Sequence, residues 1–165
     1  MLVIVITCAI LMVGVLSIYI NTRDTKFVRV KKGQIVDFTH SMTQSGLPIL
    51  TFYQGKTPYN FLMDTGSNAS YVNQYSNISI NKSRAKSTFI GADGVTHPVD
   101  IAMVKLFLND KEYECPVSVA DLDASFKDIK STYGITLHGI IGTDFMNKYN
   151  YCIDFLEYVV YQRAK

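Results

Sequence analysis

The sequence predicts a mainly β domain with one or two short helices, preceded by an N-terminal transmembrane helix. The first indication is an uncharged, apolar segment that fills positions 1–22 of the 165-residue chain. The second is a series of short runs rich in β-branched and aromatic residues, separated by turn residues. With 48% hydrophobic and 18% charged residues, the chain has the composition of a folded protein with one core.

The segment at 1–22 is long enough, at about 1.5 Å per residue, to cross a hydrocarbon core of about 30 Å. A cleaved signal peptide is the alternative, but no basic residue precedes the apolar run and no small-residue cleavage site follows it. Basic residues crowd its C-terminal side, namely Arg23, Lys26, Arg29, Lys31 and Lys32. By the positive-inside tendency, the rest of the chain lies on the cytoplasmic side, and the flank contacts anionic lipid head groups.

Strand-length runs follow one another through the rest of the chain. In the N-terminal half these runs are FVRV (27–30), QIVDFTH (34–40), LPILTFYQ (47–54), TPYNFLMD (57–64) and ASYVN (69–73), with turns expected at Lys32-Gly33 and Gln54-Gly55-Lys56. The segment 87–121 has two hairpin signals, Asp93-Gly94 and Asn109-Asp110, and CIDFLEYVVYQ (152–162) closes the chain as a further hairpin. We expect a flank with the first strands at 23–46 and the main domain at 47–165.

Two stretches have apolar side chains at helical spacing instead. They are ASFKDIKSTY (124–133) and TDFMNKY (143–149). We expect two short helices whose apolar faces belong to the core.

Charge and cysteine content exclude several classes of protein. Sixteen basic and fourteen acidic residues give a net charge of +2, so we expect no nucleic-acid binding. The three cysteines, Cys8, Cys115 and Cys152, are an odd number without paired short spacing, which indicates free thiols rather than disulfides or a zinc knuckle. The histidines have no carboxylate or cysteine at ligand spacing and therefore predict no metal site: His40, His97 and His138.

The first candidate for chemistry is Asp64, which opens the sequence Asp-Thr-Gly directly after a strongly apolar strand. A carboxylate in that context is a candidate catalytic group. The alternative is an ordinary turn, in which the aspartate caps and the glycine adopts a positive φ. Asp144 and Asp154 also lie near the motifs, but we expect each to cap a helix or face solvent in a hairpin.

The second element is HGIIGTDFM, in which Ile140 and Ile141 precede Gly142 and a short helix. Together with the DTGS segment it resembles the retropepsin-like aspartic proteases, in particular single-domain, membrane-anchored bacterial members. The resemblance covers about residues 47–162 and implies a closed retropepsin-like barrel. In it, FIGADG stands where the family has its flap, and IDFLEYVVYQ resembles the closing strands.

The resemblance implies an aspartic endopeptidase that hydrolyses a peptide or protein substrate with water and needs no metal or other cofactor. One carboxylate must take a proton while another donates one, so a single aspartate is insufficient. The chain has no second Asp-Thr-Gly, and the resemblance therefore implies a homodimer in which Asp64 of each subunit meets its mate and shares one proton. Thr65 would bond across the dimer, Gly66 would allow close backbone approach, and Ser67 would either bond to Asp64 or serve as a turn residue.

The expected flap tip consists of Gly91, Ala92, Asp93 and Gly94. By the resemblance it closes over an extended peptide, and the alternative is a static type I′ turn. A functional alternative for the whole protein is a membrane-tethered peptide-binding module that keeps the barrel but does not cleave.

Overall fold

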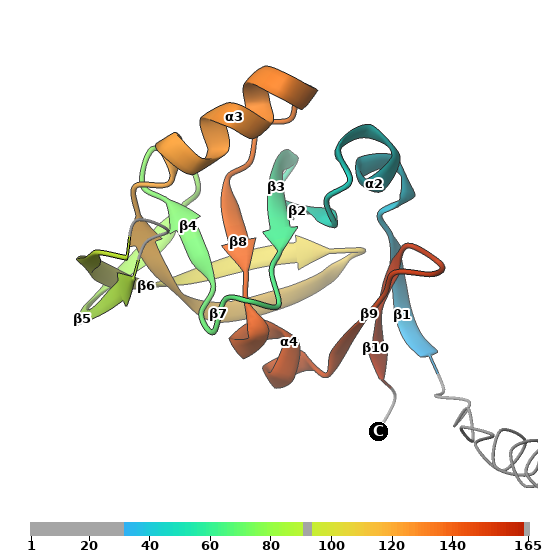
Figure 1. The fold of residues 1–165 in the computed structure, drawn as a ribbon. Helices are drawn as coiled ribbons and strands as arrows, with labels where there is room; N and C mark the ends of the chain where they lie inside the picture. Colours follow the sequence, from blue (N-terminus) through green and yellow to red (C-terminus); the bar gives the residue numbers. More distant parts are fainter. Residues whose placement is uncertain (1–31, 91–93, 164–165) are drawn as a thin grey trace, which may run out of the picture. The chain divides into compact units, whose positions relative to one another are not determined.

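A computed structural model describes residues 32–90 and 94–163 (Figure 1). The expected membrane anchor at 1–22, the flank up to residue 31 and the flap residues Gly91, Ala92 and Asp93 lie outside these ranges. Within the described part of the chain, no helix is both long and apolar enough to span a membrane.

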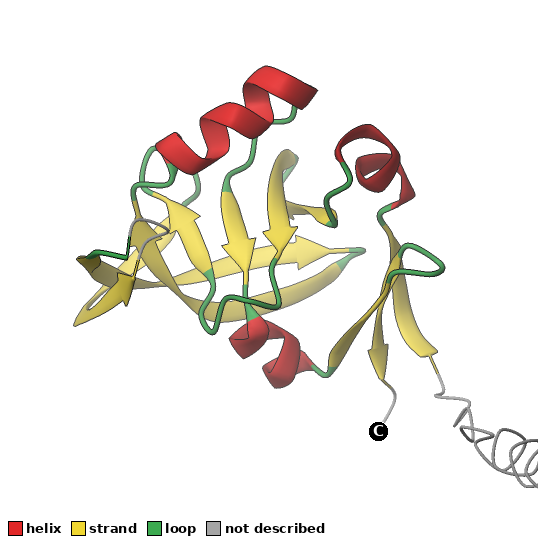
Figure 2. Ribbon diagram, viewed as in Figure 1, coloured by secondary structure: helices red, strands yellow, loops and turns green. Residues whose placement is uncertain are grey.

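Strands make up most of the described chain, and short helices lie between them (Figure 2). The strands are β1 (Lys32–Asp37), β2 (Ile49–Gln54), β3 (Thr57–Met63), β4 (Tyr71–Asn73), β5 (Ile80–Ile90), β6 (Thr96–Leu108), β7 (Lys111–Ala120), β8 (Gly139–Ile141), β9 (Tyr151–Asp154) and β10 (Val159–Arg163). The described helices are α2 (Thr39–Ser45), α3 (Asp123–Tyr133) and α4 (Thr143–Tyr149).

Six strands close into a barrel in the order β2-β3-β8-β4-β7-β6, and β6 pairs back to β2. The closing contact between β2 and β6 is the single pair Tyr53 and Phe107. Strand β5 extends this sheet beyond β6, while β1, β10 and β9 form a separate three-stranded sheet. The prediction of a mainly β fold with a closed barrel is confirmed at this level.

The predicted hairpin at Asn109-Asp110 is confirmed and shows why these residues stand there. Leu108 pairs with Lys111, so the loop between β6 and β7 has two residues. Asn109 and Asp110 have φ angles of 46° and 62°, the left-handed conformation that a type I′ turn requires and that Asn and Asp tolerate. The hairpins at Gly55 and between β9 and β10 also form as predicted.

Three predicted features are wrong in the N-terminal part and in the helix count. Thr39 and His40, expected at the end of a strand, instead begin α2, and Lys32-Gly33 belongs to β1 instead of a turn. The reason is local hydrogen bonding: the Asp37 carboxylate accepts the amide of Thr39 at 3.0 Å and its hydroxyl at 2.8 Å, which turns the chain away from β1. Gly46 ends α2 with a φ of 71°. With α2 the described helices number three instead of one or two.

The barrel interior is filled by aromatic and aliphatic side chains that alternate along the strands. Along β7 the buried positions include Tyr113, Cys115 and Val117, as the period of two requires. Phe145 of α4 packs against Phe52 and Tyr113, with ring centroids 5.9 Å and 5.4 Å apart, and this packing holds the helix against the barrel. The predicted helices at 124–133 and 143–149 are thus confirmed, and both bury apolar residues in the core.

A histidine joins the start of β8 to β3. His138 Nδ1 accepts the amide of Asn60 at 3.0 Å, and the His138 amide donates to the Asn60 carbonyl at 2.8 Å. Burial lowers the pKa of His138, and its bond from Asn60 requires an unprotonated Nδ1.

We expect this histidine to make stability depend on pH. Because its pKa is lower in the folded chain than in the unfolded chain, its contribution is present above pH ~6.5 and is lost as pH falls below that value. Chemical denaturation at pH 8, 7, 6 and 5 should show the free energy of unfolding falling more steeply in wild type than in His138→Gln. The difference in slope should reach at most about 1.4 kcal/mol per pH unit. Parallel pH profiles for the two proteins would contradict the assignment.

Candidate active site

The parallel pairing of β3 and β8 brings together the two motifs singled out in the sequence. Leu62 pairs with Ile140 and Met63 with Ile141. The amide of Asp64, the first residue after β3, donates to the Ile141 carbonyl at 3.0 Å. In Figure 1 the arrows of β3 and β8 point the same way, toward α4. Asp64 and Gly142, 78 residues apart in sequence, therefore leave neighbouring strands at the same end of the barrel.

The loop after β3 orients the Asp64 carboxylate. The Gly66 amide donates to Asp64 Oδ1 at 2.8 Å, and the Ser67 amide donates to the Asp64 carbonyl at 3.2 Å. Asp64 is half-buried, whereas Thr65 and Gly66 are exposed. The aspartate thus sits at a tight turn, and its carboxylate is held by a backbone donor at the edge of the domain.

Ser67 has the turn role that the sequence left open. Its hydroxyl donates to the Ala69 carbonyl at 2.7 Å. Its own carbonyl accepts the amide of Thr143 at 2.9 Å and the Thr143 hydroxyl at 3.2 Å. Ser67 therefore fastens the Asp64 loop to the first residue of α4.

Gly142 has a steric role. A Cβ added there would overlap the backbone carbonyl of Ala69 and lie 3.0 Å from the Ser67 carbonyl oxygen. Its φ of −91° is open to any residue, so the requirement for glycine comes from the close approach of the Asp64 loop.

A contact of this site that was not predicted from the sequence joins Ser70 to Asp144. The Asp144 carboxylate accepts the Ser70 amide at 3.0 Å, the Ser70 hydroxyl at 2.7 Å and the Phe145 amide at 2.7 Å. The Ser70 hydroxyl in turn accepts the Gly142 amide at 3.1 Å. The expected helix cap at Asp144 is wrong, because Gly142 is the N-cap residue of α4 and no side chain caps this end of the helix. The Asp144 carboxylate lies in the first turn of α4 and clamps the Asp64 loop, which no local pattern signals.

We expect this clamp to contribute strongly to stability. Ser70 is buried, so Ser70→Ala removes a charge-assisted bond and leaves the Gly142 amide without its acceptor, which should cost about 2–3 kcal/mol. Asp144→Asn should cost a similar amount because an amide nitrogen cannot accept a bond. A double-mutant cycle by urea denaturation should give less than additive losses. Ser131→Ala, a surface serine bonded to one carbonyl, is the matched control, and additive losses would contradict a shared network.

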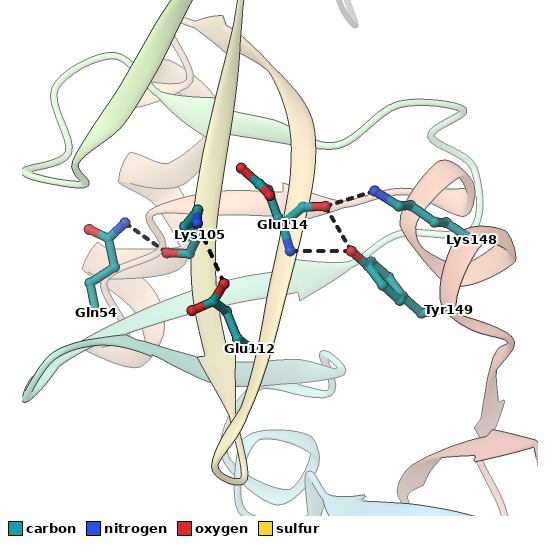
Figure 3. A network of polar contacts seen from close by, with 6 residues as sticks. All are labelled: Gln54, Lys105, Glu112, Glu114, Lys148 and Tyr149. Carbon is teal, nitrogen blue, oxygen red and sulfur yellow. Dashed lines mark hydrogen bonds and ion pairs between the residues drawn. The ribbon is translucent and has the colours of Figure 1, made fainter.

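The far end of α4 is held by β7 (Figure 3). Lys148 Nζ and the Tyr149 hydroxyl each donate to the Glu114 carbonyl at 2.7 Å, and the Glu114 amide donates to the Tyr149 hydroxyl at 3.2 Å. Nearby, the side-chain amide of Gln54 on β2 donates to the Lys105 carbonyl on β6 at 2.9 Å. This bond lies next to the pair Tyr53 and Phe107, which closes the barrel. Helix α4 is thus fixed at both ends, and with it the Asp64 loop.

Ionisable groups near α4 are shifted toward their neutral forms. Burial, with a smaller contribution from the Asp144 charge, raises the pKa of Tyr71. Burial raises the pKa of the Cys115 thiol to about 12, which makes this cysteine unreactive. Both described cysteines, Cys115 and Cys152, are free. Among the residues that the structure describes, no group of three or more His, Cys, Asp or Glu side chains could hold a metal ion.

The hairpin that carries the expected flap is present up to its tip. Strands β5 and β6 pair as far as Ile90 and Thr96. Gly94 has a φ of 74°, and Ile90 and Val95 beside it expose 72% and 52% of their surfaces. The described residues that flank the tip therefore present apolar side chains to solvent.

No protein-family model matches this chain, and no curated protein matches it in sequence.

Proposed function

We propose that the protein is an aspartic endopeptidase of the retropepsin-like type, active as a membrane-anchored homodimer. The observation that supports the proposal is the placement of Asp64. Its carboxylate follows β3, is bonded to the Gly66 amide, and lies in a loop clamped to the Ile141–Gly142 end of β8. The bond from Gly66 is also that of an ordinary Asx turn, so the clamp of this loop to the end of β8 is the part of the observation that favours a catalytic position.

In the proposed reaction, two Asp64 carboxylates from the two subunits share one proton. The ionised carboxylate removes a proton from water, whose oxygen attacks the peptide carbonyl, while the protonated carboxylate donates its proton to the carbonyl oxygen. The tetrahedral species then returns that proton to the carboxylate that donated it. The other carboxylate passes the proton that it took from water to the leaving nitrogen as the C–N bond breaks. Because one proton must be shared, the rate should fall at both acid and alkaline pH.

The exposed position of Thr65 and Gly66 supports this dimer. A two-fold axis must pass between the paired carboxylates, so the residues beside Asp64 must be accessible to the partner. In the proposed dimer an extended peptide lies between the Asp64 pair and the β5–β6 hairpin, whose apolar Ile90 and Val95 are exposed. The membrane anchor at 1–22 and a cytoplasmic orientation belong to the same proposal.

The activity is tested by incubating a diverse peptide pool with the protein and identifying the products by mass spectrometry. New termini with wild type, and their loss with Asp64→Asn, support the proposal. Retention of peptides without any cleavage would instead favour the membrane-tethered peptide-binding module.

The homodimer is tested by dilution. Each chain supplies only half of the proposed site, so activity requires the dimer. The specific activity of a truncated protein that begins at Phe27 should therefore fall on dilution, because the dimer dissociates. The full-length protein in vesicles, at the same bulk concentration, should retain its activity because tethering in a thin layer raises the effective concentration. Constant activity of the truncated protein down to nanomolar concentration, with a sedimenting monomer, would exclude the shared site.

A further inference from the structure

A cavity of about 540 Å³ lies against α3, away from the Asp64 loop. Its walls come from the first residues of β3, the loop after β4, α3 and the loop before β8, so it is at the opposite end of β3 from Asp64. Three buried side chains give it an apolar wall: Tyr59, Phe126 and Leu137. Its volume and lining are those of a small-ligand site.

Several hydrogen-bond donors that line this cavity have no partner among the described residues. Lys127 and Lys130 of α3 line it, are exposed, and form no ion pair with any residue that the structure describes. Ser76, from the loop after β4, also lines it. The Ser76 hydroxyl is the one buried side-chain polar group in the described ranges that lacks a hydrogen-bond partner. Such a group is costly to leave unpaired.

Two acceptors of the same cavity are already occupied. Asp123 Oδ1 accepts the Asn73 amide at 2.7 Å, and Asn73 Oδ1 accepts the Leu122 amide at 3.3 Å. His138 Nδ1 accepts the Asn60 amide, so the neutral ring carries its proton on Nε2 and offers a further donor. Together with Lys127 and Lys130, this histidine gives the cavity donors that can meet a hydrogen-bond acceptor of a ligand.

The charge of the lining limits the ligand further. Lys127 and Lys130 contribute two positive charges and Asp123 one negative charge, which leaves one positive charge to be balanced. A single carboxylate balances it, and an apolar group attached to that carboxylate can occupy the wall formed by Tyr59 and Phe126.

We propose that this cavity binds a carboxylate attached to an apolar group, with the carboxylate toward Lys127 and Lys130. Two sources share this chemistry: the C-terminus of an apolar peptide and a free apolar acid. The inference does not depend on the proposed protease, since the cavity is separate from Asp64.

Binding is measured by calorimetry with the full-length protein in lipid nanodiscs, carrying Asp64→Asn so that no peptide is cleaved. The probes are N-acetyl-Leu-Phe, its C-terminal amide, 3-phenylpropanoate and 3-phenylpropylamine. We expect the acids to bind and the amide to bind roughly tenfold more weakly or worse, because the charge-assisted bonds are lost. Binding of the peptide acid alone identifies a peptide C-terminus, and binding of both acids identifies any apolar acid.

Substitutions of residues that line the cavity test whether the acids bind there. Lys127→Gln with Lys130→Gln should weaken the acids by roughly tenfold or more, whereas Lys82→Gln with Arg84→Gln, an equal charge change on exposed β5, should leave them unchanged. No binding of either acid at millimolar concentration, equal binding of acid and amide, preference for the amine, or insensitivity to the lysine pair would overturn the proposal.

Discussion

Replacing Asp64 by Asn is expected to lower the rate of peptide hydrolysis by several orders of magnitude while the protein stays folded. The proposed reaction needs one ionised and one protonated carboxylate, and an amide can supply neither. The fold should survive because Asn retains an oxygen that can accept the Gly66 amide, now bonded to Asp64 Oδ1 at 2.8 Å. The measurement is single-turnover cleavage of a substrate found in the peptide pool, with the circular dichroism melt recorded in parallel.

Asp110→Asn is the control for this substitution. It makes the same chemical change in the exposed β6–β7 turn, where a φ of 62° suits Asn as well as Asp. Its activity and melting temperature should match wild type. If pure Asp64→Asn cleaved at a comparable rate, the carboxylate mechanism would be wrong. If it failed to fold, the pH profile of wild type would still test the mechanism, because a shared proton requires the rate to fall at both acid and alkaline pH.

Replacing Gly142 by Ala is expected to give the largest loss of stability. The new Cβ would overlap the Ala69 carbonyl in a buried part of the chain, where backbone instead of a flexible side chain must move. Overpacking costs about 1–3 kcal/mol, and we expect a loss of about 3 kcal/mol because no rotamer change can relieve it. Displacing the loop would also separate Asp64 from β8, so activity should be lost as well. Urea denaturation measures the free energy of unfolding directly.

Gly66→Ala is the matched comparison for this prediction. A Cβ at Gly66 would meet Asp64 Oδ1 at 3.2 Å, and the position is exposed. The Gly66→Ala variant should remain nearly as stable as wild type. Its new methyl group should push the Asp64 carboxylate into another orientation, so the substitution should lower activity more than stability. Equal stability of the Gly142→Ala and wild-type proteins would show that the loop is not packed against α4 as described.

The strands, hairpins and two of the helices could be predicted because their signals are local. Runs of apolar, β-branched and aromatic residues marked β2 and β3, while helical spacing marked α3 and α4. Helix α2 was missed because β-branched and aromatic residues before it suggested a strand. The contact that ends the strand is the pair of hydrogen bonds from the Thr39 amide and hydroxyl to the Asp37 carboxylate. Such a local side-chain bond competes with strand pairing over only two or three residues.

The candidate site divides in the same way. Asp64 and Gly142 were predicted, because a carboxylate after an apolar strand and a glycine before a helix are visible in the sequence. The clamp between Ser70 and Asp144 was not, because 74 residues separate them and either alone reads as a turn or cap residue. The cavity against α3 was also not predicted, since its lining comes from four separate segments.

By itself the sequence determined most of the strand-length runs, the turn that needs Asn and Asp at positive φ, and the aspartate that follows an apolar strand. These are properties of short segments, set by backbone sterics and side-chain alternation. Only the tertiary structure decided that β3 and β8 run side by side and that the barrel closes through the pair Tyr53 and Phe107. Those contacts depend on packing between segments far apart in the chain, for which no local pattern specifies a partner.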